Sequence, residues 1–242
     1  MESLLILQII AHFLADFTFQ PQRWCDRKEM KLISKQHFYH AAVVFVSSWL
    51  LALNFGFWLP ALIIAVTHFG LDVLKSFLAK KNFLTKYWFF IDQALHLAII
   101  VLIVNLFYDD NSRYAIFDWT FHYATNKLIL ILALILCTSP ANVFIKKIMA
   151  AYAIFHIKDR KNVSLVRAGR IIGTLERILT FVLILVDQFT AVGFIFAAKS
   201  ILRFRDTDKT EAKTEYLLIG SLLSFGIAIL LGIFYKEIIC KS

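Results

Sequence analysis

The chain contains few residues that interrupt helices and few charged residues. Only 18% of its 242 residues are charged, and it contains three Pro and eight Gly. Few prolines and glycines favour long uninterrupted helices. The three cysteines, Cys25, Cys137 and Cys240, form no C-x-x-C pair. Their spacing argues against both a disulfide framework and a thiolate metal site.

Apolar residues take the place of the missing charge. They make up 60% of the sequence, and the mean hydropathy is +0.70, whereas soluble domains are about 45–50% apolar. Apolar runs of ~20 residues can cross a bilayer as helices, which pair their own backbone groups. The sequence therefore predicts an all-α polytopic membrane helix bundle with about 6–8 transmembrane or re-entrant helices. The expected helices are 3–20, 37–59, 60–79, 87–108, 127–146, 171–202 and 215–235.

The formal net charge of +9 comes from Lys and Arg placed between apolar runs. Basic loops alternate with neutral or acidic loops over the first part of the chain. The positive-inside rule then predicts an external N-terminus and cytoplasmic basic loops. We therefore expect membrane lipids, and no nucleic acid, as partners of the basic residues.

The sequence divides into three expected parts. Residues 1–108 are predicted to form a four-helix membrane bundle rich in His and Asp, and residues 109–126 an extramembrane loop. Residues 127–242 are expected to hold the C-terminal membrane helices, with a basic cytoplasmic segment at 146–170. The stretch "HFLAD" at 12–16 is similar to "HFGLD" at 68–72, which suggests a duplicated hairpin. The range 171–202 would span about 48 Å as one helix, so it is either one long span or two arms of a re-entrant hairpin.

Ionisable side chains recur at helical spacing in the first part. His12 and Asp16 lie four residues apart in the first expected helix, and the third repeats this order, so each pair shares one helix face. The order is reversed in the fourth helix, which runs in the opposite direction, and His40 comes from the second. The pattern thus predicts seven side chains at matched depth: His12, Asp16, His40, His68, Asp72, Asp92 and His96.

Such groups are costly inside a membrane and normally mark a functional site. Imidazoles beside carboxylates suit zinc, or a two-metal site of zinc, manganese or iron. The expected metal ligands are His12, His68, His96, Asp16, Asp72 and Asp92. The expected catalytic residues are Asp16, Asp72, Asp92 and His40, with one remaining Asp as the base and His40 as a further ligand or a stabiliser of developing charge. This set predicts a metal-dependent hydrolase, acting on a lipid or lipid-linked substrate near the cytoplasmic face.

Two other interpretations of the same residues stay open. A transporter or channel would use them to bind a cation or relay protons. A structural subunit would use them as buried His–Asp pairs between helices. The outer halves of the first four helices are apolar, which favours a site reached from one side.

The C-terminal part contains two further patterns. Four cations, Arg170, Arg177, Lys199 and Arg203, either anchor helix ends at the interface or bind an anionic lipid headgroup. Small residues recur at Gly220, Ser224, Ala228 and Gly232, and this stripe allows a close helix approach. It indicates packing inside the chain or, as the alternative, a homo-oligomer seam.

Several stretches resemble a known bacterial family. "AHFLADFTFQP", "THFGLDVLK" and "DQALH" are similar to the membrane family called domain of unknown function 3307. The later stretches "GRIIGTLERILT" and "AAKSILRF" resemble the C-terminal half of its longer members. The style of the motifs is similar to that of membrane-bound metal-dependent hydrolases. The resemblance implies a multi-pass protein of the bacterial cytoplasmic membrane.

Overall fold

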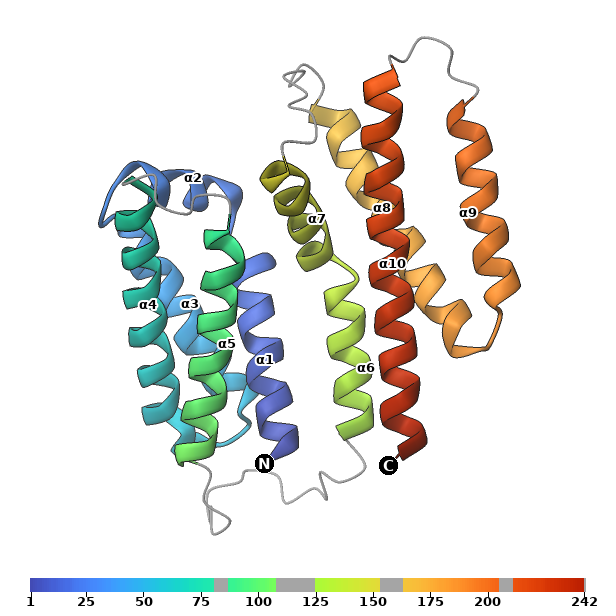
Figure 1. The fold of residues 1–242 in the computed structure, drawn as a ribbon. Helices are drawn as coiled ribbons and strands as arrows, with labels where there is room; N and C mark the ends of the chain where they lie inside the picture. The colour runs from blue at the N-terminus through green and yellow to red at the C-terminus, as the bar shows by residue number, and fades with distance from the viewer. Residues whose placement is uncertain (81–86, 108–124, 153–162, 205–210, 242) are drawn as a thin grey trace. The chain divides into compact units, whose positions relative to one another are not determined.

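The computed structural model describes residues 1–80, 87–107, 125–152, 163–204 and 211–241. These residues form ten α-helices and one short 3-10 helix, with no strand among them (Figure 1). The all-α prediction is confirmed. The chain divides into two compact units, Met1–Leu132 and Ala133–Ser242. Nearly all of the expected loop at 109–126 lies outside the described residues.

Unit 1 is a bundle of four long helices with a short helix across one end. The long helices are α1 (Glu2–Phe17), α3 (Lys35–Leu51), α4 (Trp58–Lys80) and α5 (Trp88–Phe107), and the short elements are α2 (Gln22–Met30) and η1 (Phe55–Phe57). Contacts join α1 to α3, α3 to α4, α4 to α5 and α5 to α1. The four long helices therefore close into a ring, and Figure 1 shows α2 across their upper end.

The segment between α1 and α3 differs from its prediction as a loop, because α2 occupies most of it. The chain turns by 80° between α1 and α2, with Pro21 in extended conformation before the first residue of α2. Ser34 and the His37 side chain form a capping box at the start of α3. These contacts fix α2 over the end of the bundle.

The core of unit 1 is apolar over most of its depth. Its buried residues are Ala15, Val44, Ala52, Phe57, Ala61, Ile64, Ala65, Ile100, Ile103 and Val104. One polar pair interrupts this core: the Gln8 side chain donates to the Ser48 carbonyl at 3.0 Å and accepts from the Ser48 hydroxyl at 2.5 Å. The pair satisfies both ends of the Gln8 amide inside the bundle.

Two ranges of the C-terminal part each contain a break between two helices: 127–146, expected as one helix, and 171–202, for which two arms were one of the two alternatives. In place of 127–146 the chain forms α6 (Thr125–Leu136) and α7 (Ser139–Ala151), which bend by 46° at the break. Pro140 lies in the first turn of α7, where its missing N–H leaves no intrahelical bond unmade. In place of 171–202 the chain forms α8 (Val163–Leu185) and α9 (Phe189–Phe204). Asp187 has φ 60° in the turn between them, a left-handed conformation that Asp tolerates better than most residues.

The last helix, α10 (Glu211–Lys241), contacts α7, α8 and α9 in unit 2. By length and composition, three stretches could cross a membrane: Phe55–Leu78, Trp88–Phe107 and Glu215–Cys240. The number rises to five if α1 with α2 and α6 with α7 each count as one bent span. The described helices thus indicate a membrane protein, and the expected number of about 6–8 spans is not confirmed.

The small-residue stripe of α10 packs against other helices of unit 2. A Cβ added at Gly220 would lie 3.6 Å from Met149 Sδ, and one added at Gly232 would lie 2.7 Å from Ile184 Cγ2. Ala228 is completely buried. The stripe therefore allows α7 and α8 to approach α10 within the chain, and a homo-oligomer stays a prediction.

Replacing Gly232 by Ala is expected to destabilise unit 2. The new methyl group would lie 2.9 Å from Ile184 Cβ, an atom fixed to the backbone of α8, so the helices must move apart at a cost of about 1–3 kcal/mol. The matched control is Gly226→Ala on the same helix, where nothing lies within 4 Å of the added Cβ. Thermal unfolding in detergent should show a lower midpoint for Gly232→Ala alone. Equal midpoints for the two variants would contradict this packing.

Candidate metal centre

The four long helices of unit 1 bring all seven predicted side chains together. His12 and Asp16 come from α1, His40 from α3, and two i, i+4 pairs come from α4 and α5. The four imidazoles and the carboxylates of Asp72 and Asp92 are buried, and Asp16 keeps 10% of its side chain exposed. The ends of the cluster differ, because α2 lies beside one end and the apolar core beside the other.

Three donor atoms from three helices converge most closely. His40 Nε2 lies 2.9 Å from His68 Nε2. Asp16 Oδ1 lies 3.2 Å from His40 Nε2 and 3.4 Å from His68 Nε2. Two ligand atoms on a tetrahedral ion with bonds of ~2.0–2.1 Å are about 3.3 Å apart. The Asp16–His40–His68 triad thus has the spacing of three corners of a tetrahedral site.

Two lysines neutralise the other two carboxylates. Lys28, from α2, donates to Asp72 Oδ2, and the Lys28 carbonyl accepts from the Ser76 hydroxyl at 3.3 Å. Lys75 donates to Asp92 Oδ2 at 2.6 Å. Asp72 Oδ2 also lies 3.9 Å from both His40 Nε2 and His68 Nε2. Among the described groups, Asp16 is therefore the carboxylate of the cluster without an ammonium partner.

The hydrogen bonds of Gln93 assign the tautomer of His12. The Gln93 amide nitrogen donates to Asp16 Oδ2 at 3.1 Å, so its Oε1 is the atom 3.2 Å from His12 Nε2. An amide oxygen only accepts, so His12 Nε2 carries the proton and Nδ1 carries a lone pair. That Nδ1 is buried without a hydrogen bond, 3.8 Å from Asp16 Oδ1. Two acceptors therefore face each other with no donor between them in the described structure.

His96 is another buried imidazole with unsatisfied nitrogens, and His40 Nδ1 is likewise buried without a partner among the described groups. Only 2% of His96 is exposed, and neither of its ring nitrogens has a hydrogen-bond partner in the described structure. Its ring stacks on that of His68 with centroids 3.9 Å apart. A buried polar group left unpaired costs about 1–3 kcal/mol. His12 and His96 thus both present donor atoms suited to an ion.

The possible ligands form three overlapping groups. Each group offers atoms that lie within 4.8 Å of one another: Asp16, His40 and His68; His12, His68 and His96; and Asp72, Asp92 and His96. All seven residues belong to at least one group. The arrangement can hold one cation in the closest group and has further donors beside it.

Residues outside the prediction also shape the site. Lys28 comes from a basic stretch in which nothing marks it apart from its basic neighbours, so sequence reasoning missed it. Gln93 follows Asp92 in "DQALH", and a second polar residue beside Asp92 was the available signal. His37 is buried on α3, but Ser34 N–H donates to its Nδ1 at 3.2 Å. Its Nε2 therefore carries the proton that reaches Ser76 Oγ, and no lone pair remains for an ion.

The basic residues of the C-terminal part lie in different surroundings in unit 2. Arg177 is 2% exposed and donates to the carbonyls of Cys137 and Thr138 at 2.7 and 3.3 Å, at the break between α6 and α7. Lys199 pairs with Glu176 and lies 5.5 Å from the centre of the Phe225 ring. Arg170 is exposed, and the side chain of Arg203 lies outside the described residues. The anionic-headgroup site stays a prediction.

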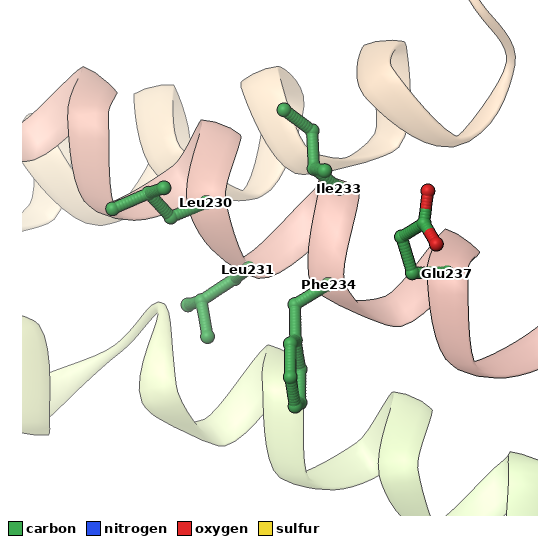
Figure 2. Close-up of a pocket in the computed structure, with 5 residues that line it drawn as sticks. All are labelled: Leu230, Leu231, Ile233, Phe234 and Glu237. Atoms are coloured by element: carbon green, nitrogen blue, oxygen red, sulfur yellow. The ribbon is translucent and has the colours of Figure 1, made fainter.

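Unit 2 also has a pocket on α10, and none of the seven clustered residues lines it. Figure 2 shows its lining residues, which are Leu230, Leu231, Ile233, Phe234 and Glu237. Four of the five are apolar, so this pocket lacks the converging polar groups of a catalytic site. The seven-residue cluster is the candidate functional site.

Gln93→Leu is expected to destabilise unit 1. The substitution removes the donor to Asp16 Oδ2 and the acceptor for His12 Nε2, and unpaired buried groups of this kind cost about 1–3 kcal/mol. Asn105→Leu is the control, because Asn105 is an exposed residue of the same helix that bonds only to the Val101 carbonyl among the described groups. Chemical unfolding in mixed micelles should separate the two variants. A Gln93→Leu protein as stable as the control would show that the bridge is not needed.

Residues 4–121 of the chain match the family model described as "Protein of unknown function (DUF3307)". The matched range contains all seven residues of the cluster and, apart from the first two residues of α1, the ring of helices that holds them. No curated protein and no solved structure matches the chain. The resemblance to this family is thus confirmed over residues 4–121. The resemblance of the later stretches and the similarity to membrane-bound hydrolases stay predictions. Over residues 4–121, the chain carries a domain of unknown function 3307.

Proposed function

We propose that this protein is a metal-dependent hydrolase of the bacterial cytoplasmic membrane that acts on a lipid or lipid-linked ester. The observation that carries the proposal is the Asp16–His40–His68 triad, whose donor atoms lie 2.9–3.4 Å apart. This spacing fits a divalent ion bound by nitrogen and oxygen ligands. Zinc suits such a set best, and manganese and iron are the alternatives.

The charges of the cluster also favour a bound cation. Three carboxylates face two ammonium groups, those of Lys28 and Lys75. With neutral imidazoles one negative charge remains, and it lies on Asp16. A buried charge without a partner is costly, and a divalent cation beside Asp16 removes that cost.

The chain's own residues supply the remaining parts of a hydrolytic site. A divalent ion held by Asp16, His40 and His68 would lower the pKa of a water and polarise the ester oxygen. Asp72 would take the proton, because its Oδ2, which is paired with Lys28, also lies 3.9 Å from both triad nitrogens. The water oxygen then bonds to the carbon or phosphorus of the ester, and the bond to the leaving oxygen breaks. The leaving oxygen receives the proton from Asp72, which restores the carboxylate.

The position of the site in the bundle supports a membrane-borne substrate near the cytoplasmic face. The cluster lies at the end covered by α2, and the exposed residues from α2 to the start of α3 include Arg23, Arg27, Lys31 and Lys35. Such basic segments face the cytoplasm under the positive-inside rule. Beyond the cluster, the described core of unit 1 is apolar apart from the Gln8–Ser48 pair. This core argues against a polar path through unit 1 and thus against the transporter alternative.

His40→Ala is expected to lose about one equivalent of bound metal, because it removes a ligand of the closest group. His37→Ala is the matched control: it changes a buried imidazole on the same helix whose two nitrogens are already hydrogen-bonded. Elemental analysis of both purified proteins, beside the wild type, measures the difference. A wild type without metal would favour a structural role for the His–Asp pairs, and equal loss in both variants would point to misfolding.

The hydrolytic step is tested with the same proteins. Wild-type protein in micelles of bacterial lipid extract should release ester-cleavage products, detected by mass spectrometry, and dialysis against a chelator should stop the release. Asp72→Asn should keep the metal and lose most of the activity, because an amide cannot take the proton. A wild type with full metal occupancy that cleaves no lipid would contradict the hydrolase and favour the transporter alternative.

A further inference from the structure

We propose that the cluster holds a second divalent cation, bound by His12, Asp92 and His96, and that the substrate is a phosphate ester. The inference rests on the proposed function of the first site. Once Asp16, His40 and His68 bind one ion, these three residues remain as buried donors outside it. His96 shares one group of donor atoms within 4.8 Å of one another with His12 and another with Asp72 and Asp92. Asp72 Oδ2 also lies 3.9 Å from the two triad nitrogens.

The unsatisfied imidazoles are the main evidence for a second ion. His96 has two buried nitrogens without partners, and Nδ1 lies 4.0 Å from Asp92 Oδ2. His12 turns a lone pair on Nδ1 into the cluster, because Gln93 holds the proton on Nε2. A metal-ligating His usually has its other nitrogen held by such a hydrogen bond. His12 therefore already has the tautomer and the support of a ligand.

Asp92 is the carboxylate of this second group, and it already binds a cation. Lys75 Nζ lies 2.6 Å from Asp92 Oδ2, and 36% of the Lys75 side chain is exposed, against 3% for Asp92. The ammonium can therefore turn toward water while the carboxylate cannot. The Lys75 ammonium thus occupies a cation position beside Asp92. In the proposed two-ion state the metal ion takes this position and Lys75 turns toward water.

The charge of the two-ion state indicates the class of substrate. With Lys75 turned out, three carboxylates, the Lys28 ammonium and two divalent ions leave two positive charges. A phosphate dianion neutralises them, whereas a carboxylic ester brings no charge. Paired ions about 3.5–4 Å apart are the arrangement that stabilises both the attacking and the leaving oxygen of phosphoryl transfer. A lipid carrying a phosphate ester therefore fits this site best.

Equilibrium dialysis against Mn²⁺, followed by elemental analysis, tests the second ion. Wild-type protein should bind about two equivalents and His96→Ala about one, with His37→Ala equal to the wild type. The bound pair should also give the exchange-coupled spin resonance signal of two neighbouring Mn²⁺ ions, absent in His96→Ala. A wild type with one equivalent, unchanged in His96→Ala, would overturn the second site and leave the proposed function standing. A wild type with none would overturn both.

Lys75→Met is a second test that keeps every proposed ligand. Removing the competing ammonium should lower the dissociation constant of the second Mn²⁺ by about tenfold or more, whereas Lys35→Met, at an exposed position of α3, should not change it. Inorganic phosphate is the probe for substrate class: its ³¹P resonance should broaden with the Mn²⁺-loaded wild type and much less with His96→Ala. An unchanged constant in Lys75→Met, or equal broadening in both proteins, would contradict the proposal.

Discussion

Three carboxylates inside an apolar helix bundle impose the constraint on which the rest of unit 1 depends. Each must have a counter-charge, because an isolated carboxylate in a low-dielectric interior is too costly to keep. Lys28 and Lys75 provide it for Asp72 and Asp92. Asp16 has two imidazole nitrogens within 3.4 Å instead. The position of α2 follows from the same constraint, since this helix carries Lys28 into the bundle.

Unit 2 contains a buried charge of the opposite sign and stabilises it in another way. Among the residues that the structure describes, no carboxylate accepts a hydrogen bond from Arg177. Arg177 donates to carbonyls at the α6–α7 break and to the side chains of Asn142, Thr174 and Ser224. Carbonyl groups at a helix end carry partial negative charge, so the break and the arginine stabilise each other. This pairing explains why Arg177 lies inside unit 2 and not at an interface.

The sequence predicted much of the site because helical spacing restricts where side chains can lie. The four-residue spacing of His12 and Asp16, repeated in α4 and reversed in α5, places those groups on one face of each helix. Spacing could not reveal that Lys28 enters the site, because its partner Asp72 is 44 positions away. It also could not rank the ligands: His40, predicted in a supporting role, lies at the centre of the closest group.

The two helix breaks of the C-terminal part, one missed at 127–146 and one left open at 171–202, have a common physical origin. The ranges 127–146 and 171–202 are mostly apolar, and apolar composition alone does not show where a helix breaks. The first break depends on Pro140 and on the distant Arg177, and the second on a left-handed Asp187 whose carboxylate pairs with Lys236 on α10. Contacts of this kind join residues far apart in the chain. The all-helical class and the four long helices of unit 1 could be predicted because they depend on local sequence pattern.

The most direct measurement of the central claim is X-ray absorption at the zinc K-edge of the purified protein loaded with zinc. The account predicts a first shell of nitrogen and oxygen only, at about 2.0–2.2 Å, with the outer-shell scattering of imidazole rings. That result would place the ion among His and Asp side chains. A first shell containing sulfur at about 2.3 Å, or one made of oxygen without imidazole, would place any bound zinc elsewhere and contradict the account.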